Sequence, residues 1–226
     1  LLAAGKGAAA AGQFSQGLRY NPSAPGHLYV GELCRQLKDD SLAAEHFLAA
    51  VRLNAPVIPA YIKLADAYLR SGQLEAAIEW SEKGQKRHAG IAEFYEIGAQ
   101  AYSAKGDVAQ AVAQYESGLA VLPGNAYLMT RLAWLLATVP DAAFREGKRA
   151  LELAEQACRL TQFRQPQALD ALAAAYAETG HFSNAVDFAQ KARQRASDAG
   201  MPALVQAIEK RIALYRAKRP FRQAAE

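Results

Sequence analysis

Apolar and small residues recur along the chain with the spacing of amphipathic helices. Tyr61, Leu64, Ala65 and Tyr68 precede a glycine, Gly72, and a further alanine. The same residue types return 34 positions later, beginning at Tyr95, and related versions begin at His27, Met129 and Leu169. Positions three and four residues apart share one face of a helix. Each set therefore predicts two antiparallel helices joined by a short turn.

Small residues recur where the two helices of each pair are expected to cross. They are Ala65, Ala99, Ala133 and Ala173 in the first helices, and Ala43, Ala77, Ala111 and Ala185 in the second. A helix often ends at a glycine in the left-handed conformation, which predicts turns at Gly72, Gly106 and Gly180. Lys38 occupies the corresponding place in an earlier pair, so we expect a longer or altered turn there. One pair cannot bury its apolar face alone, so the pairs are predicted to stack.

Composition supports a helical protein and excludes other classes. Alanine accounts for 51 of the 226 residues, with only nine prolines, which favours many closely packed helices. No apolar run approaches the about 18 residues of a membrane span, and two cysteines cannot form a disulfide framework. The net charge of +4 is concentrated in residues 191–226. We interpret that charge as the solvated side of a terminal helix and predict no nucleic-acid partner, since Tyr215 and Phe221 alone interrupt it.

The repeated residue types and their spacing resemble the tetratricopeptide repeat family over nearly the whole chain. Another helical-hairpin repeat of similar period is the alternative. The resemblance implies an all-α, right-handed superhelical solenoid of antiparallel helix pairs. The expected parts are a partial repeat (1–23), repeats at 24–57, 58–91 and 92–125, a repeat at 126–165 with an inserted loop near 139–147, a repeat at 166–199, a capping helix (200–219) and a basic tail (220–226).

The first residues, Leu1 onward, include neither an initiator methionine nor a signal peptide. We therefore expect a processed or truncated N-terminus, or a fragment of a longer protein. The half-repeat at residues 1–22 would expose apolar surface, so self-association through it is a further expectation. The C-terminal third is similar to the end of large bacterial tetratricopeptide repeat proteins. The compartment stays open between bacterial cytoplasm and periplasm.

No pattern of catalytic or metal-binding residues is found. The four histidines, His27, His46, His88 and His181, are widely separated and form no metal-binding motif. Gly7 and Gly12 have P-loop spacing but lack the lysine and hydroxyl residue that follow in that motif, so we predict a helix there. Cys34 and Cys158 are predicted to be buried. Asp66, Glu96 and Asp170 are expected on helix faces without a paired partner of an evident catalytic type, and we predict no enzyme, metal or cofactor.

In the tetratricopeptide repeat family, the first helix of each repeat lines a concave, partner-binding surface. Carried over by position, the resemblance implies a groove formed by Glu32, Arg35, Lys63, Asp66, Arg70, Glu96, Gln100, Tyr127, Arg131, Trp134 and Asp170. The family's chaperone-type carboxylate clamp is not supported, because Leu28 and Glu32 occupy the places of its lysine and asparagine. The asparagine ladder of the glycosyltransferase-type groove is absent as well. Trp134 is expected either to be an exposed anchor or to be buried against the Pro140 loop or a neighbouring repeat.

These observations predict a protein-interaction scaffold that binds a peptide or partner segment, without catalysis. The segment is expected to contact Lys63, Arg70, Arg131 and Trp134. Two alternatives stay open: a regulatory or anchoring domain of a larger membrane or glycosyltransferase-like enzyme, and a structural subunit of a membrane-associated assembly.

Overall fold

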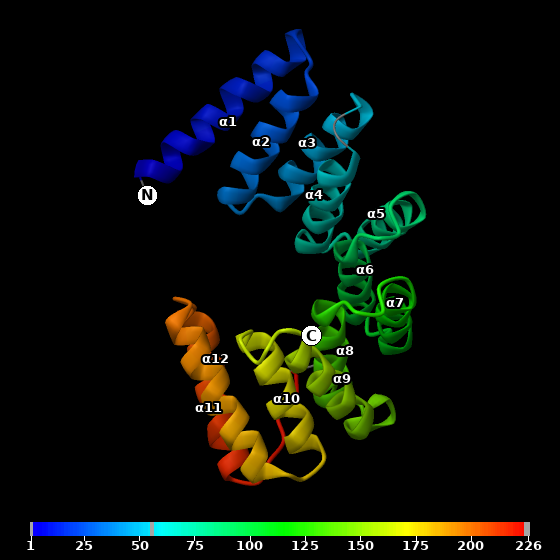
Figure 1. Cartoon of the computed structure of the whole chain (residues 1–226). Coiled ribbons are helices and arrows are strands. Elements are labelled where there is room, and N and C mark those ends of the chain that lie inside the picture. The colour runs from blue at the N-terminus through cyan, green and yellow to red at the C-terminus, as the bar shows by residue number, and fades with distance from the viewer. Residues whose placement is uncertain (1, 55–56, 224–226) are drawn as a thin grey trace. The chain divides into compact units, whose positions relative to one another are not determined.

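The computed structural model describes residues 2–54 and 57–223, and over these residues the chain is entirely helical (Figure 1). The prediction of an all-α repeat fold is confirmed. Two compact units divide the chain, Leu1–Ala111 and Val112–Glu226, and are called here the first and second unit. No helix among the described residues is long and apolar enough to cross a membrane.

The first unit is built from α1 to α6. Their bounds are α1 (Leu2–Tyr20), α2 (Ala24–Gln36), α3 (Asp40–Arg52), α4 (Val57–Arg70), α5 (Leu74–Arg87) and α6 (Ala92–Ala104). The division between the units falls within α7 (Val108–Val121). Gly7 and Gly12 lie inside α1, as predicted, and not in a phosphate-binding loop.

The second unit contains α8 to α12 and one short 3-10 helix. Their bounds are α8 (Ala126–Thr138), η1 (Ala142–Phe144), α9 (Gly147–Leu160), α10 (Pro166–Glu178), α11 (Phe182–Asp198) and α12 (Pro202–Arg216). Pro140 and Asp141 follow α8, and the Asp141 side chain accepts a hydrogen bond from the Ala143 amide. That cap begins the 3-10 turn in the link between α8 and α9.

Close helix crossings explain the recurring alanines. All eight alanines predicted to lie at the crossings are fully buried. Glycine serves the same purpose at Gly31, where an added Cβ would lie 2.4 Å from the ring of Phe47. The small side chains let the helix axes approach, and the large side chains then fill the space between neighbouring pairs.

The turns between paired helices share one geometry. Gly72 has a φ of 75°, and the next amide, of Gln73, donates to the carbonyl of Tyr68. Lys38 adopts the same left-handed conformation, with a φ of 63°, and the amide of Asp39 donates to Cys34 in the same way. Our expectation of an altered turn at Lys38 is therefore wrong. The hydrogen bonds of the turn offset the roughly 1 kcal/mol cost of a left-handed lysine.

Helix α12 closes the apolar core of the second unit. Ile208 and Tyr215 are fully buried, Ile212 nearly so, and Leu204 packs at their edge, which confirms the predicted apolar stripe. The basic residues of this end were expected to form the solvated side of the helix, and one of them does not. Arg211 is 6% exposed, because it faces inward to a carboxylate described below.

Candidate functional site

A hollow of about 650 Å³ opens in the second unit between α8, α10 and α12. Its lining comes from Tyr127, Thr130, Arg131 and Trp134 on α8, Gln165, Gln167 and Asp170 at or near the start of α10, and Leu204, Ala207 and Arg211 on α12. Four residues of the predicted groove, Tyr127, Arg131, Trp134 and Asp170, are thus brought together. The hollow combines aromatic rings with amide, hydroxyl and charged groups.

Tyr127 gives the hollow an exposed aromatic wall. Its side chain is 43% exposed at the start of α8. The residue at the helix cap, Asn125, accepts a hydrogen bond from the Leu128 amide. This cap fixes the first turn of α8 and with it the direction of the tyrosine.

Trp134 is half-buried, so neither of its two predicted environments is correct. The ring centroid lies 5.7 Å from that of Phe221, and the guanidinium carbon of Arg211 lies 5.0 Å from the indole centroid. The tryptophan therefore packs against α12 and the C-terminal segment. An arginine over an indole ring is a favourable cation–π contact.

Asp170 and Arg211 form a buried ion pair at the floor of the hollow. Arg211 Nη2 and Nε lie 2.5 and 3.0 Å from the two carboxylate oxygens, and the side chains are 8% and 6% exposed for Arg211 and Asp170. Burial raises the pKa of Asp170 to about 6, and the guanidinium of Arg211 opposes that rise. The partner that the structure gives Asp170 is thus the cation of Arg211.

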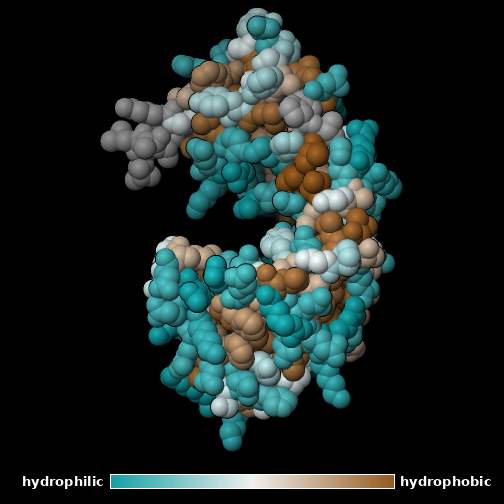
Figure 2. Space-filling view, viewed as in Figure 1, coloured by the Kyte–Doolittle hydropathy of each residue, from teal (hydrophilic) through white to brown (hydrophobic). Residues whose placement is uncertain are grey.

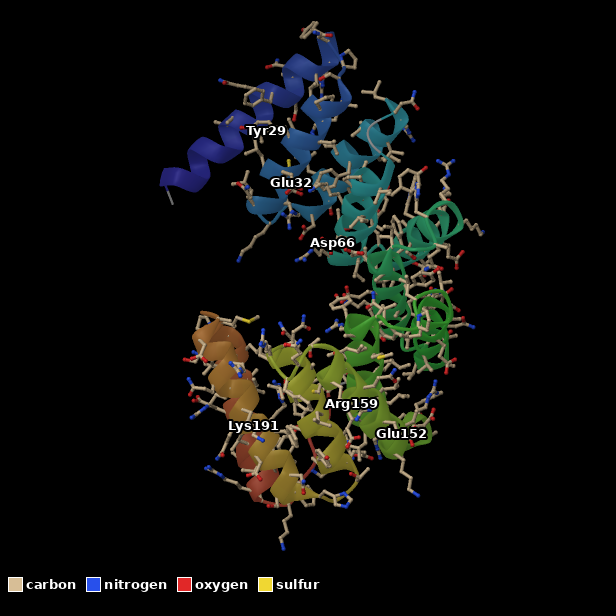
Figure 3. The ribbon with its side chains drawn as sticks, viewed as in Figure 1. Tyr29, Glu32, Asp66, Glu152, Arg159 and Lys191 are labelled. Carbon is tan, nitrogen blue, oxygen red and sulfur yellow. The ribbon has the colours of Figure 1, made fainter. Side chains whose placement is uncertain are left out.

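The charged residues predicted in the first unit surround a smaller hollow of about 260 Å³. It is lined by Glu32, Arg35, Ile62, Lys63, Asp66, Glu93, Glu96 and Ile97, from α2, α4 and α6. Figure 3 labels Glu32 on α2 and Asp66 on α4.

Ion pairs hold most of these charged side chains. Glu32 accepts hydrogen bonds from Lys63 and, at 2.9 Å, from Arg35. Burial alone would raise the pKa of Glu32, but these two hydrogen bonds outweigh it and lower that pKa below its usual range. Asp66 accepts a hydrogen bond from Arg70.

Glu96 accepts a hydrogen bond from Gln100. The predicted residues Arg70 and Gln100 therefore contact residues that line the hollow of the first unit. In the space-filling view, teal side chains gather on the face that carries α2 and α4 (Figure 2).

A histidine pair, His27 and His46, was missed by the sequence analysis. Their Nδ1 atoms lie 3.0 Å apart, and His46 Nε2 lies 3.0 Å from the hydroxyl of Ser15 on α1. Burial lowers the pKa of both imidazoles. The two histidines belong to one predicted helix pair, which is the signal that relates them. Within the described part of the chain, no group of three or more such side chains is arranged to hold a metal ion.

Both cysteines are buried, as predicted. Cys34 lies in the first unit and Cys158 in the second. Burial raises the pKa of the Cys158 thiol to about 12, so this thiol stays protonated and unreactive near neutral pH.

Comparisons with known proteins identify the repeats. A tetratricopeptide repeat family model matches residues 49–205. No curated protein sequence matches the chain. Among solved structures, TTC0263, a thermophilic tetratricopeptide repeat protein of Thermus thermophilus, is 21% identical, with a TM-score of 0.64 over 86% of this chain and 99% of that one.

Two further structures are similar in fold. Yeast Tom70 is 18% identical with a TM-score of 0.66, and the match covers 92% of this chain and 43% of Tom70. YrrB, a tetratricopeptide repeat protein described as having an unusual peptide-binding site, is 14% identical with a TM-score of 0.53, over 87% of this chain and 97% of YrrB. At identities this low, the structural similarity shows a shared fold alone.

Proposed function

The chain belongs to the tetratricopeptide repeat family, and from that premise we propose that it is a protein-interaction module whose second unit binds an extended segment of a partner. In this proposal the chain contributes binding and not catalysis. The observation that carries it is the hollow between α8, α10 and α12, where Tyr127, Arg131 and Trp134 meet.

The residue types around this hollow are those that dominate binding energy at protein interfaces. Tyrosine, tryptophan and arginine are enriched at such hot spots. The volume of about 650 Å³ falls within the usual range of roughly 300–1,000 Å³ for ligand sites, and can accept several side chains of a peptide. The peptide-binding site described for YrrB, a protein of similar fold, supports the same interpretation.

We place the binding surface in the second unit and not in the charged hollow around Glu32, because that hollow is smaller, at about 260 Å³, and two of its lining acids, Glu32 and Asp66, are ion-paired. Lys63 and Arg70, which we also expected to contact the partner, lie in the first unit. The same surface would bind a partner in either alternative setting, as a domain of a larger enzyme or as a subunit of a membrane-associated assembly. Self-association through residues 1–22 is a separate proposal, which sedimentation of the purified chain would test.

A peptide-display selection on the purified chain tests the proposed function. Tyr127→Ala and Arg131→Ala should each weaken the selected peptides by about tenfold or more, because hot-spot residues contribute about 2 kcal/mol. Tyr29→Ala and Arg159→Ala are matched controls, since Tyr29 is an exposed tyrosine of the first unit and Arg159 an exposed arginine of α9. Figure 3 labels both control residues.

Circular dichroism confirms that each variant is folded. This location for the site would be refuted if the selected peptides bind the Tyr127→Ala and Arg131→Ala variants as tightly as the unaltered chain. It would also be refuted if the two control variants weaken binding by the same amount.

A further inference from the structure

The C-terminal segment of the second unit folds back over the ends of its helices. Helix α12 ends at Arg216, and Lys218 then turns the chain with a φ of 53°. Pro220 prevents the helix from continuing. Figure 1 shows the segment returning from the end of α12 toward α8. We name residues 219–223 the C-terminal strap. Residues 224–226 of the predicted basic tail lie outside the described residues.

An aromatic side chain of the strap is held by a cation and a second ring. The centroid of Phe221 lies 5.7 Å from that of Trp134, and the guanidinium carbon of Arg211 lies 5.5 Å from the Phe221 centroid. Arg211 is itself fixed by its ion pair with Asp170. The receiving surface for the aromatic side chain is therefore rigid, and it consists of residues from α8 and α12.

The following residue of the strap, Arg222, reaches a carboxylate at the end of α10. Its Nη2 atom lies 2.5 Å from Glu178, and its Nη1 atom donates to the carbonyl of Ala137 near the end of α8. A cation is stabilised at the C-terminus of a helix by the helix dipole. The side chain of Glu178 is only 14% exposed, and its carboxylate is shared between Arg222 and Arg145, whose Nε atom lies 3.1 Å from the other oxygen.

One main-chain hydrogen bond completes the contact. The amide of Gln223 donates to the carbonyl of Thr138 at 2.9 Å. Phe221, Arg222 and Gln223 nevertheless stay partly exposed, and Arg222 is 31% exposed. The strap is thus attached by an aromatic contact, one ion pair and a few hydrogen bonds, as an extended peptide would be.

We propose that this surface of the second unit recognises a partner segment in which an aromatic residue precedes an arginine, and that the strap is the built-in occupant which such a segment replaces. The proposal rests on the proposed function and names the chemistry of its partner. Replacing the strap would also leave Trp134 in contact with the partner, and Trp134 borders the hollow described above.

A tethered occupant sets a high threshold for binding. A strap joined to α12 by a few residues has an effective concentration on the order of 1 mM. If the strap segment itself has a Kd of about 10 µM for this surface, a competing free peptide would bind the intact chain about 100-fold more weakly than it binds the vacated surface. Only a partner of high affinity, or one that also contacts the hollow, would replace the strap.

The test uses the full chain with Phe221→Ala and Arg222→Ala combined, which weakens the strap in place. A fluorescent peptide with the sequence of residues 216–223 should bind this variant at least tenfold more tightly than it binds the unaltered chain. A peptide with the phenylalanine and arginine exchanged has the same charge and composition, and should bind at least tenfold more weakly. Raising the salt concentration should weaken binding, because the arginine contact is ionic.

Absence of binding to the folded double variant would overturn the proposal, and so would equal binding of the exchanged peptide. If the double variant fails to fold, a protease site inserted between Ala217 and Lys218 replaces it. After cleavage of the folded chain, exchange of the cut segment for labelled peptide would support the proposal, and a cut segment that never exchanges would overturn it.

Failure of this inference can be told apart from failure of the proposed function. Tyr127 lines the hollow, and the contacts described for the strap do not involve it. Tyr127→Ala added to the double variant should therefore leave binding of the strap peptide unchanged. Strap-peptide binding without any Tyr127-dependent partner would support the inference and contradict the proposed location of partner binding. If partners bind in a Tyr127-dependent way but the strap peptide does not bind, the proposed location of partner binding would be supported and this inference contradicted.

Discussion

The buried ion pair of the second unit predicts a large and pH-dependent effect of one substitution. Arg211→Met removes the cation that faces Asp170, whose side chain is 6% exposed. A buried carboxylate left without its partner costs about 3–5 kcal/mol in the free energy of unfolding. We expect a loss of this size near pH 8, together with about 1 kcal/mol from the lost contact with the ring of Trp134.

Protonation should relieve part of this loss. Asp170 already has a pKa of about 6, raised by burial against the pull of Arg211. Without Arg211 that pKa rises further, so the folded chain holds a proton that the unfolded chain releases near pH 4. When the pKa is higher in the folded state, stability is present at low pH and is lost as the pH rises through that value. Arg211→Met should therefore be less damaging at pH 5 than at pH 8.

The assay must report on the second unit alone. The chain has two tryptophans, Trp80 in the first unit and Trp134 in the second. Urea unfolding followed by fluorescence in a Trp80→Phe background then reports on Trp134. Arg193→Met is the matched control, because Arg193 pairs with Glu209 at 3.5 Å on the surface, and such pairs contribute about 0.5 kcal/mol.

A double variant separates the lost ion pair from lost packing. Asp170→Leu combined with Arg211→Met leaves no buried charge, so it should be more stable at pH 8 than Arg211→Met alone, by about 2 kcal/mol or more. The reasoning is refuted if Arg211→Met costs no more than Arg193→Met. It is also refuted if the double variant is as unstable as the single one.

Three further predictions concern the first unit, one for a change of pH and two for substitutions. Acidification should loosen the packing of α1, α2 and α3. Burial lowers the pKa of the histidine pair, with Glu45 partly opposing this at His46, so stability is present above about pH 6.5 and is lost below it. Amide protection factors between about pH 5 and 7.5, corrected for the pH dependence of the exchange reaction itself, measure this. Gly31→Ala should cost about 1–3 kcal/mol, because its Cβ would meet the ring of Phe47; thermal denaturation measures the loss. Lys38→Gly should stabilise the chain by about 0.5–1 kcal/mol, since its φ is 63°; urea unfolding followed by Trp80 fluorescence measures the gain.

Each of these predictions has a control and a contradicting result. A His27→Gln and His46→Gln chain should lose the pH dependence of the protection factors, and protection factors that do not change with pH in the unaltered chain would contradict the first prediction. Gly12→Ala lies in open space and should not destabilise α1; an equal loss there would contradict the clash argument. A destabilised Lys38→Gly would show that lysine is not strained at this turn.

The sequence alone determined the helices, their pairing and the sites of close crossing. These properties depend on local spacing: apolar residues three and four apart select a helix face, and small residues at a fixed period let two axes approach. The crossing alanines, Ala77 and Ala173 among them, are fully buried for this reason. The turn at Lys38 shows where a local rule fails. Glycine is preferred there, but the hydrogen bonds of the turn hold a lysine in the same conformation.

Only the tertiary structure decided the partners of the functional side chains. Asp170 and Arg211 are 41 positions apart, and no local pattern relates a residue near the start of α10 to one on the last helix. Trp134 could be placed on a helix face, but its contact with Phe221 depends on how the chain returns after α12. Helix periodicity fixes which face a side chain shares with its neighbours along the chain. The groups it meets across space, and therefore its charge and exposure, follow from how the helices pack.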